Sequence, residues 1–505
     1  MTQTTQLADL AALVDGKHIG HATIEGITSD SRAVKSGVLF AAVPGQRVHG
    51  ARFAAGAIAA GASAIVTDPE GAAMIAADGA DVPQLIVDNV SSRLGEIAAQ
   101  VYGNPARDLR TYAITGTNGK TTTAFLLEYI LAAAGRVTGL IGTVTLRLAG
   151  HEIPAAMTTP MPADFQRLLA DLVSRGGSDL VIEASSHALA QGRTDPVCFD
   201  VAGFTNLTQD HLDFHNTFEE YFEAKASLFS KRRSRRAVVC VDDEWGRRLA
   251  SQAIEELGAA NVLALSVKGA LPEGLRGWTA SSRPGSGHTD ITLHSTDGET
   301  LRVSTALPGG FNVANVALAV VMALASGLRA ENLPSDISPA VPGRMEVVST
   351  KPRVVVDFAH NTDAIIKAME ALRETTVGKL VVVTGAAGER DKGKRPAMGA
   401  AVARYADVAI ITDDDPHSED PAAIRRDVLA GTGGYDARVV EIADRCEAIR
   451  TAILDAAPED TILLAGRGHE TIQEVGKELI ELDDRVEARR ALADREADPS
   501  QEKNA

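Results

Sequence analysis

The stretch "AITGTNGKTTTA", residues 113–124, decides the fold of the region around it. The preceding "RTYAI" is an apolar strand pattern, and "TTTAFLLEYILAAAG" after it has the apolar spacing of a helix. A glycine-rich turn between strand and helix is typical of a phosphate-binding loop, because the N–H groups at the helix start can bind phosphate oxygens. The usual pattern G-x-x-x-x-G-K-[ST] requires a Gly where this chain has Ile114, so we interpret the loop as a shortened variant.

Two side chains in this stretch have the chemistry of a nucleotide site. Lys120 can reach the terminal phosphates, and Thr121 offers a hydroxyl to Mg²⁺. A plain glycine turn is the alternative. The Gly-Lys-Thr-Thr sequence in a strand–loop–helix context favours the nucleotide site.

The pattern of strands and helices around the loop predicts an α/β protein of three domains. From about 108 to 341, short apolar strands alternate with helices, which predicts a mostly parallel central sheet of the P-loop type, with a β-rich peripheral part at about 258–309. From about 342 five further β runs predict a doubly wound, Rossmann-like domain. We therefore predict domains at 1–107, 108–341 and 342–505, with residues from about 488 frayed.

Composition narrows the class of protein. The 505 residues are 45% apolar and carry a formal net charge of −17, which argues against nucleic acid or an anionic membrane as main partner. The basic run "KRRSRR", 231–236, could be a nucleic-acid patch, but a solvated strand end before "AVVCV" is favoured. The apolar stretch "VALAVVMALASGL", 316–328, is too short to span a bilayer and reads as a buried helix.

The cysteines and the N-terminus indicate the compartment. Cys198, Cys240 and Cys446 are odd in number and widely spaced, without a C-x-x-C pair, so neither a disulfide framework nor a zinc site is expected. The first residues lack the pattern of a secretory signal. We expect a cytoplasmic protein.

Two further strand ends carry possible metal ligands. Glu183 ends the strand of "VIEASSHALAQGR", and Asp210 and His211 follow the strand of "VAGFTNLTQDHLDFH". Ligands bind at the carboxyl ends of parallel strands, and Glu183 and His211 suit a second Mg²⁺. Each residue alone could be a cap or a salt-bridge partner, but two such ends beside a phosphate loop favour the metal site.

Lys225 lies on an otherwise apolar, aromatic helix face in "YFEAKASLF", residues 221–229. Such a lysine could extend its amine to solvent. If it is buried, it tends to lose its proton. A neutral amine can react with CO₂ and become an anionic carbamate.

The C-terminal domain adds charged groups, mostly at the ends of β runs. They are found in "PGRMEVV", "DFAHNTD", "TGAAGERDKGKRP", "DDDPHSEDP" and "AGRGHE". A second domain of this kind can close over an ATP domain and exclude water, an arrangement that suits the joining of two substrates.

Taken together, these motifs resemble the Mur ligases, the ATP-dependent amide-forming enzymes of peptidoglycan synthesis. "GTNGKTT" is shared by the whole superfamily, including folylpolyglutamate synthetases. The set "SDSR" (29–32), "TTP" (158–160), "EASSHALAQGR", "NLTQDHLDFH", "GERDKGKRP" and "DDPH" is similar to the MurE type, which adds the third residue to UDP-N-acetylmuramoyl-L-alanyl-D-glutamate. The resemblance implies an acid–amino-acid ligase, monomeric and without membrane insertion, that uses ATP and Mg²⁺.

The resemblance also implies roles for individual residues. It implies that Lys225 is carbamylated and acts with Glu183 and His211 around the second Mg²⁺. The UDP end would be held by Ser31 and the loop around Gln46, and the sugar–peptide part by Thr158, Thr159, Ser185, Gln191 and Arg193. ATP would be bound by Gly116, Thr117, Asn118, Gly119, Lys120, Thr121, Thr122, Asn312, Arg344 and Asp357. The pocket for the incoming amino acid would comprise Arg390, Asp414, Asp415, Pro416, His417, Gly466 and Glu470.

One departure from the family pattern bears on which amino acid the enzyme would add. Members that add meso-diaminopimelate typically read Asp-Asn-Pro-Arg here, and the Arg holds the distal carboxylate through two hydrogen bonds. This chain reads Asp414-Asp415-Pro416-His417: a neutral His cannot form that fork, and Asp415 would repel a second carboxylate and attract an ammonium. We therefore favour L-lysine, with L-ornithine or another basic diamino acid second. Meso-diaminopimelate is the alternative if Arg390 or a neighbour holds the carboxylate.

Three other functions are compatible with the phosphate loop. A folylpolyglutamate synthetase-like ligase is the nearest, and the N-terminal "SDSR" speaks against it. A small-molecule kinase and a non-catalytic nucleotide-binding protein are more distant. The products separate them: an amide with ADP, a phosphoester with ADP, or neither.

Overall fold

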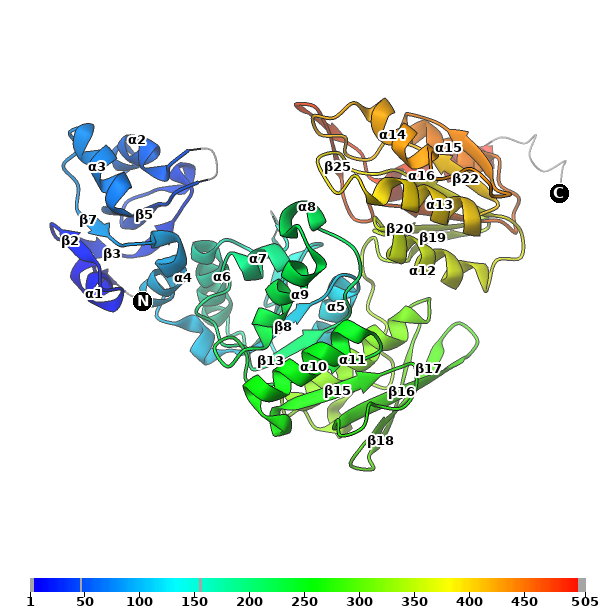
Figure 1. Cartoon of the computed structure of the whole chain (residues 1–505), viewed down its shortest axis with the longest axis horizontal. Helices are drawn as coiled ribbons and strands as arrows, with labels where there is room; N and C mark the ends of the chain where they lie inside the picture. The colour runs from blue at the N-terminus through cyan, green and yellow to red at the C-terminus, as the bar shows by residue number, and fades with distance from the viewer. Residues whose placement is uncertain (1–3, 46–47, 154–156, 498–505) are drawn as a thin grey trace.

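The computed structural model describes residues 4–45, 48–153 and 157–497. Three large sheets follow one another along the chain, as the colour gradient of Figure 1 shows, and β1–β3 and β25–β26 form two small antiparallel pairs beside the first and the last of them. The N-terminal sheet has the order β2-β7-β6-β5-β4, in which only the β2–β7 pair is antiparallel. Its elements are β1 (Thr5–Gln6), α1 (Leu7–Leu13), β2 (Lys17–Ile19), β3 (Thr23–Ile24), β4 (Gly26–Thr28), β5 (Val38–Ala42), α2 (Ala54–Ala59), β6 (Ala64–Thr67), α3 (Pro69–Ala77), β7 (Gln84–Ile86) and α4 (Val90–Val101).

The central sheet is the largest, with the order β11-β10-β9-β12-β8-β13-β14-β15-β16-β17-β18. The strands from β9 to β16 in this order are parallel. The elements are β8 (Arg110–Thr115), α5 (Lys120–Ala133), β9 (Thr138–Ile141), β10 (Leu146–Leu148), β11 (His151–Ile153), α6 (Pro162–Ser174), β12 (Asp179–Glu183), α7 (Ser186–Ala190), β13 (Val201–Phe204), α8 (Leu212–His215), α9 (Phe218–Ala226), β14 (Ala237–Cys240), α10 (Glu244–Leu257), β15 (Val262–Ser266), β16 (Gly277–Pro284), β17 (Thr289–Ser295), β18 (Thr300–Thr305) and α11 (Phe311–Ala325).

Both faces of this sheet are covered, because successive side chains of a strand point to opposite faces. Tyr112 and Ile114 of β8 pack with α5 and α11 on one face, while Ala113 packs with α6, α9 and α10 on the other. The predicted buried helix is α11. The β-rich peripheral part is an antiparallel extension of the same sheet, β16–β18. The basic run 231–236 precedes β14, as predicted for a strand end.

The C-terminal sheet has the order β19-β20-β24-β21-β22-β23, with only the β19–β20 pair antiparallel. The five predicted β runs are strands β20 to β24, with α12–α14 on one face and α15 and α16 on the other. This confirms the doubly wound prediction. The elements are β19 (Glu346–Thr350), β20 (Arg353–Asp357), α12 (Thr362–Arg373), β21 (Leu380–Thr384), α13 (Lys394–Tyr405), β22 (Val408–Ile411), α14 (Pro421–Leu429), β23 (Arg438–Glu441), α15 (Arg445–Leu454), β24 (Thr461–Ala465), β25 (Ile472–Val475), β26 (Glu478–Glu481) and α16 (Asp484–Ala497).

The prediction of a frayed end from about residue 488 is wrong up to residue 497. Helix α16 continues to Ala497 and packs against α15. Arg445 and Asp484 form an ion pair at 2.6 Å, and both side chains are fully buried. The charged sequence of α16 suggested a solvated tail, but this pair and the apolar contacts of Ala488 and Ala491 fix the helix on the sheet.

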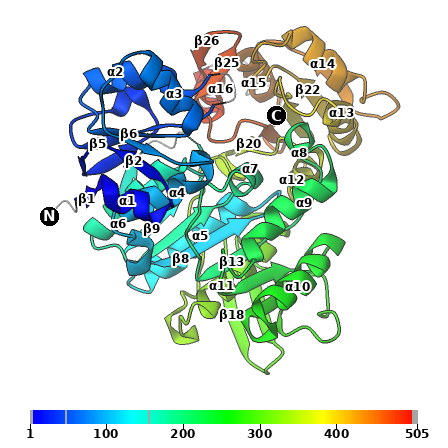
Figure 2. The same cartoon turned by 60° about the vertical axis from the view of Figure 1, so that its left-hand side comes forward.

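The N-terminal domain joins the central one through α4, which packs against α6 (Figure 2). None of the helices in the described part of the chain has the length and apolarity needed to cross a bilayer. Cys198, Cys240 and Cys446 are all free thiols, in line with the prediction of no disulfide framework.

Candidate active site

The glycine-rich turn 116–119 connects β8 to α5 at the carboxyl ends of the parallel strands. Gly116 and Gly119 have φ values of 145° and 88°, which residues with a Cβ rarely adopt. A Cβ on Gly119 would also lie 2.4 Å from Asn315 Oδ1. Ile114 is fully buried within β8, so the strand continues through the position where the longer loop has its first Gly. This explains the shortened pattern.

Lys120 is the first residue of α5, and its amine turns back onto its own loop. Nζ donates to the carbonyl oxygens of Thr117 at 2.8 Å and Gly116 at 3.1 Å. Burial lowers the pKa of this amine. The charged end of Lys120 therefore lies at the turn whose geometry suits phosphate.

Glu183, at the end of β12, is fully buried beside the loop. Its Oε2 accepts hydrogen bonds from the hydroxyls of Thr121 at 2.9 Å and Thr143 at 3.1 Å, and its Oε1 accepts from the Thr143 N–H at 2.8 Å. A threonine hydroxyl beside a carboxylate is a hard oxygen donor set that fits Mg²⁺. Sequence reasoning missed Thr143, which follows β9 without a motif of its own.

Lys225 is 1% exposed, so the alternative that it extends to solvent is wrong. Its Nζ donates to Gly116 O at 2.7 Å and lies 4.4 Å from the centre of the Tyr221 ring. Within the described residues no carboxylate forms an ion pair with it. Burial lowers the pKa of the amine well below its usual value, and Lys120 adds to the effect.

His211 lies near the Lys225 amine and lines the large cavity described below. Burial lowers the pKa of its imidazole to about 3; Asp210 opposes the shift and Lys225 increases it. The ring is therefore neutral at pH 7, the form in which histidine binds a metal. Thr121, Glu183, Lys225 and His211 thus surround one end of the loop, as the sequence predicted, while the ligand roles stay a prediction.

The residues predicted to hold the rest of ATP come from two domains. Arg344 Nη2 donates to Thr121 Oγ1 at 3.1 Å, and its guanidinium lies 4.2 Å from the centre of the Phe358 ring. Asp357 accepts from the Met345 N–H at 2.7 Å, and burial raises the pKa of its carboxyl against the effect of Arg344. Asn312 is buried at the start of α11.

The residues predicted for the sugar–peptide part form one hydrogen-bonded chain beside Glu183. Thr159 Oγ1 donates to Glu183 O at 2.7 Å and accepts from Ser185 N at 3.2 Å. Arg193 donates to Thr159 O at 3.1 Å and to Gln191 Oε1 at 2.7 Å. Thr158 contacts Thr143. By contrast, Ser31 lies in the N-terminal domain and does not line the cavity described below, and Gln46 falls outside the described residues.

The predicted amino-acid pocket is acidic and is organised by an arginine that sequence reasoning missed. The ligand atoms of Asp414, Asp415 and Glu470 lie within 4.8 Å of one another. Arg467 is fully buried, and its Nη1 lies 2.6 Å from Asp415 Oδ1 but 3.9 Å from Glu470 Oε2. Its position next to Gly466 in "AGRGHE" was the available signal. The prediction that Asp415 presents a free anion is therefore wrong, and Glu470 is the carboxylate with the weakest pairing.

The imidazole of His417 also has a carboxylate partner. Its Nδ1 lies 3.0 Å from Glu474 Oε2, and its backbone N–H donates to Glu474 O. This contact connects the 414–417 element to β25. Gly466 has a φ of 117°, and a Cβ there would lie 2.6 Å from Asp414 Oδ2. Arg390 is exposed on the cavity rim, and Pro416 is buried behind it.

Glu470 allows a prediction about stability. Burial, with Asp414 and Asp415, raises the pKa of its carboxyl to about 8. The folded state then binds more protons than the unfolded state between pH 4.5 and 8, so this group's contribution to stability falls as pH rises through that range. We expect Glu470→Gln to melt at a higher temperature than the wild type at pH 9, and at a similar temperature at pH 5, in thermal unfolding without ligands. The exposed Glu478→Gln variant is the control. An identical pH dependence for wild type and Glu470→Gln would contradict the assignment.

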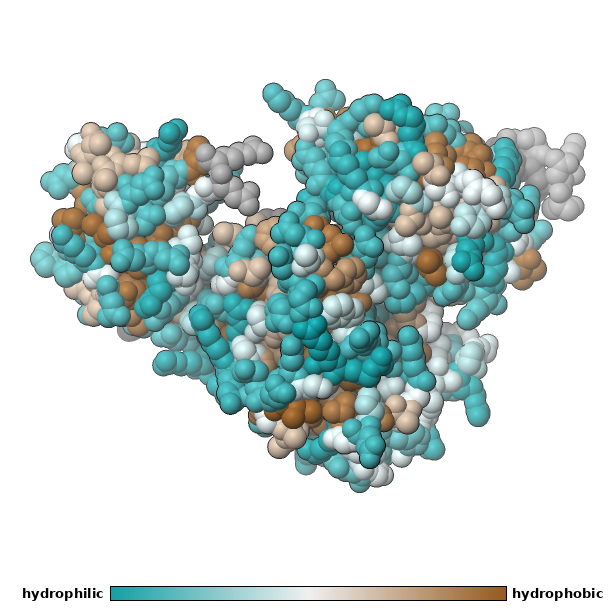
Figure 3. Space-filling model, viewed as in Figure 1, coloured by the Kyte–Doolittle hydropathy of each residue, from teal (hydrophilic) through white to brown (hydrophobic). Residues whose placement is uncertain are grey.

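Most of these residues line one cavity of about 1310 Å³, to which the central and C-terminal domains both contribute, whereas Lys225 and Arg467 lie outside its lining. The lining includes Lys120, Glu183, His211, Arg344 and Glu470. Figure 3 shows the surface hollowed between the N- and C-terminal domains, above the central domain. The phosphate loop and the acidic pocket therefore face one shared space.

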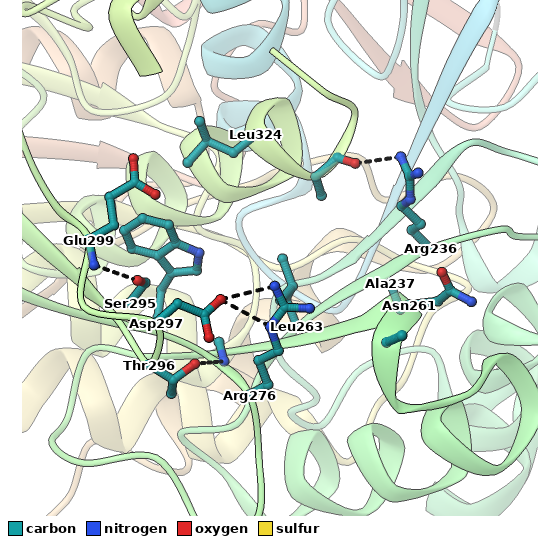
Figure 4. Close-up of a pocket in the computed structure, with 14 residues that line it drawn as sticks. Arg236, Ala237, Asn261, Leu263, Arg276, Ser295, Thr296, Asp297, Glu299 and Leu324 are labelled. Carbon is teal, nitrogen blue, oxygen red and sulfur yellow. Dashed lines mark hydrogen bonds and ion pairs between the residues drawn. The ribbon is translucent and has the colours of Figure 1, made fainter. Parts of the chain in front are cut away.

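A second, smaller cavity of about 260 Å³ lies at the opposite ends of the central strands (Figure 4). Three of its charged side chains have partners within the protein: Arg276 pairs with Asp297 at 3.0 Å, and Arg236 donates to Ala325 O at 2.7 Å. Ligands of parallel sheets bind at the carboxyl ends of strands. We assign this cavity no role in binding.

Comparison with known proteins is consistent with this geometry. The models of the Mur ligase family match in three parts: the family's catalytic domain at residues 23–102, the middle domain at 114–323 and the glutamate ligase domain at 343–468. The chain is 45% identical to the UDP-N-acetylmuramoyl-L-alanyl-D-glutamate--2,6-diaminopimelate ligase of Streptomyces coelicolor, covering 97% of this chain and 96% of that protein. The protein of the same name from Corynebacterium glutamicum is 42% identical, with 97% and 98% covered.

Solved structures of Mur ligases have the same fold as this chain. A structure of a UDP-N-acetylmuramoyl-L-alanyl-D-glutamate--2,6-diaminopimelate ligase aligns with a TM-score of 0.63 at 30% identity, covering 94% of this chain and 95% of that one. MurF ligase from Thermotoga maritima in complex with ADP aligns with a TM-score of 0.62 at 19% identity, covering 94% and 98%, and supports the fold alone.

Proposed function

The chain belongs to the Mur ligase family of ATP-dependent amide ligases, and we propose that it joins a diamino acid to UDP-N-acetylmuramoyl-L-alanyl-D-glutamate in peptidoglycan synthesis. The observation that carries the proposal is the shared cavity, in which the phosphate loop around Lys120 faces the acidic pocket around Glu470. We further propose three domains at 1–107, 108–341 and 342–505, and a cytoplasmic monomer.

The arrangement supports a reaction in two steps. The γ-carboxylate of the D-glutamyl residue attacks the γ-phosphorus of ATP, giving an acyl phosphate and ADP. The neutral amine of the diamino acid then attacks the acyl carbon, the amide forms, and phosphate leaves. Lys120 and Arg344 offset negative charge on the transferring phosphoryl group. Because an acyl phosphate hydrolyses in water, closure of the C-terminal domain over the cavity would protect it.

We propose Thr121, Glu183 and His211 as the residues that hold Mg²⁺, with Lys225 beside them. Their oxygen and neutral imidazole donors fit the ion, as the Thr121–Glu183 contact at 2.9 Å illustrates. When bound, Mg²⁺ supplies positive charge that stabilises the phosphoryl oxygens. The Thr158–Thr159–Ser185–Gln191–Arg193 chain, which adjoins Glu183, is the proposed site of the sugar–peptide part, and Ser31 is proposed for the UDP end.

The test of the ligase activity is product analysis with ATP, Mg²⁺, the UDP-linked dipeptide and a diamino acid. We expect ADP, phosphate and a UDP-linked tripeptide in equal amounts. A phosphoester, or ADP without any amide, would exclude the proposal and leave a kinase or a hydrolase.

For the amino acid we propose L-lysine over diaminopimelate. His417 stands where a distal carboxylate would need a guanidinium, and its contact with Glu474 adds a negative charge there. An ammonium beside Glu470 would supply the close cation that its carboxyl lacks and would favour the ionised form. The second candidate, 2,6-diaminopimelate, is favoured by the names of the relatives at 42–45% identity, and the exposed Arg390 could hold its carboxylate.

We expect kcat/KM for L-lysine to exceed that for meso-diaminopimelate by at least about tenfold, because one charged hydrogen bond, about 1.5–3 kcal/mol, is missing for the distal carboxylate. His417→Arg combined with Asp415→Asn should shift the ratio toward diaminopimelate. Steady-state kinetics with both amino acids and L-ornithine decide this. A wild-type preference for meso-diaminopimelate would assign that substrate instead.

A further inference from the structure

The central and C-terminal domains meet beside the phosphate loop through a small group of polar side chains. The central domain contributes Asn118, from the loop itself, and Asp210. The C-terminal domain contributes residues at the starts of α12 and α13: His360, Asn361, Asp363 and Lys394. Of these residues, only Asn118 belongs to the set predicted above to bind ATP.

Asn361 is the centre of this group. It is fully buried, and its Oδ1 accepts from the Ala364 N–H at 3.0 Å, which caps α12. That bond fixes the orientation of the amide, so Nδ2 faces the other domain. There it lies 3.1 Å from Asn118 Oδ1 and 3.3 Å from Asp210 Oδ2.

The partners of Asn361 are held in matching orientations. Asn118 Nδ2 donates to Asp363 Oδ2 at 3.0 Å and to Thr208 Oγ1 at 3.3 Å, which leaves its Oδ1 to accept from Asn361. The contact therefore joins a residue of the phosphate loop to the first turn of α12 by two complementary bonds.

Asp210 is 4% exposed, and most of the basic side chains around its carboxylate come from the other domain. His360 Nε2 lies 3.4 Å from its Oδ2 and Lys394 Nζ 3.5 Å from its Oδ1, whereas His211 of its own domain is at 3.9 Å. A buried carboxylate is costly without partners. Separation of the domains would remove these partners.

We propose that Asn361 is a positioning residue that locks the C-terminal domain onto the phosphate loop, through Asn118 and Asp210, and so holds the acidic pocket over the phosphates. The kinetic part of this inference rests on the proposed function, whereas the domain contact does not. Since both ends of the lock are short side chains, a small change at Asn361 releases it.

The test is Asn361→Asp, studied by small-angle X-ray scattering and steady-state kinetics on the full chain. Asp keeps the size and caps α12 as well as Asn does, but places a carboxylate opposite Asp210. We expect a larger radius of gyration, a kcat about 10- to 100-fold lower because the reacting groups are misplaced, and an unchanged KM for ATP. Asn361→Ser, which keeps a cap and adds no charge, should show the same changes to a lesser degree.

Two further variants make the test specific. Asp210→Asn combined with Asn361→Asp reverses donor and acceptor between these two residues and removes the repulsion, so the radius of gyration should return toward the wild-type value. The control variant Asp444→Asn exchanges the same two residue types, in the opposite direction, at the N-cap of α15. It should change neither the radius of gyration nor kcat. Wild-type scattering for Asn361→Asp, or a double variant as expanded as Asn361→Asp, overturns the proposal. Failure of the wild type to form an amide would refute the proposed function but leave the scattering result in force.

Discussion

Lys120→Ala is expected to lower ATP-dependent product formation by at least about 10³-fold while the protein stays folded, since this amine is the loop's own cation for the transferring phosphate. Nζ lies 2.8 Å from Thr117 O and 3.1 Å from Gly116 O, at the turn itself. The Lys120 side chain is half-buried and lines the large cavity. Burial lowers the pKa of the Lys120 amine, so the folded wild type carries the cost of a buried cation that the Ala variant lacks. The melting temperature should therefore not fall.

The measurements are ADP release, tripeptide formation and thermal unfolding of the same preparation. Lys120→Arg keeps the positive charge, but its larger guanidinium does not match the position of the lysine amine at the turn, so this variant should retain little activity. Lys351→Ala, an exposed lysine in the β19–β20 turn, should behave as wild type. Product formation near the wild-type rate in Lys120→Ala would remove the phosphate loop from the mechanism.

The elements of the fold were predictable because their signals are local. The strand, turn and helix around Lys120, the five β runs after residue 342 and the buried helix at 316–328 each depend on short-range periodicity and on glycine positions. The shortened loop follows the same principle, because the local pattern predicts a strand at Ile114 and this residue is buried within β8.

Contacts between distant segments could not be predicted in this way. Asn118 and Asn361 are separated by 243 positions, and Arg467 reaches Asp415 across 52. The error about Asp415 has this origin, because its charge is set by a partner that no spacing rule identifies. The same applies to α16, where the Arg445–Asp484 pair converts a charged sequence into a packed helix.

Lys225 shows how burial sharpens a prediction that sequence alone leaves open. Its amine is 1% exposed, donates to Gly116 O at 2.7 Å and forms no ion pair with a carboxylate of the described chain. Burial lowers its pKa well below the usual value. The neutral amine can attack CO₂, forming an N–C bond and releasing one proton, and the resulting carbamate changes the residue from a cation to an anion. That anion would lie beside the proposed magnesium ligands, which include the neutral imidazole of His211.

Lys225→Ala is accordingly expected to lower kcat by at least about 100-fold, because a group that orients the metal site is lost. Added short carboxylates should restore part of the activity, and Lys225→Glu should retain more than Lys225→Arg, which keeps the positive charge. In the wild type, ¹³CO₂ should give a carbamate carbon signal that Lys225→Ala lacks. Thermal unfolding of each variant separates this effect from the cavity left by the missing side chain. Full activity in Lys225→Ala, or an identical ¹³C spectrum for both proteins, would exclude the carbamate and leave Lys225 as a buried donor to the Gly116 carbonyl.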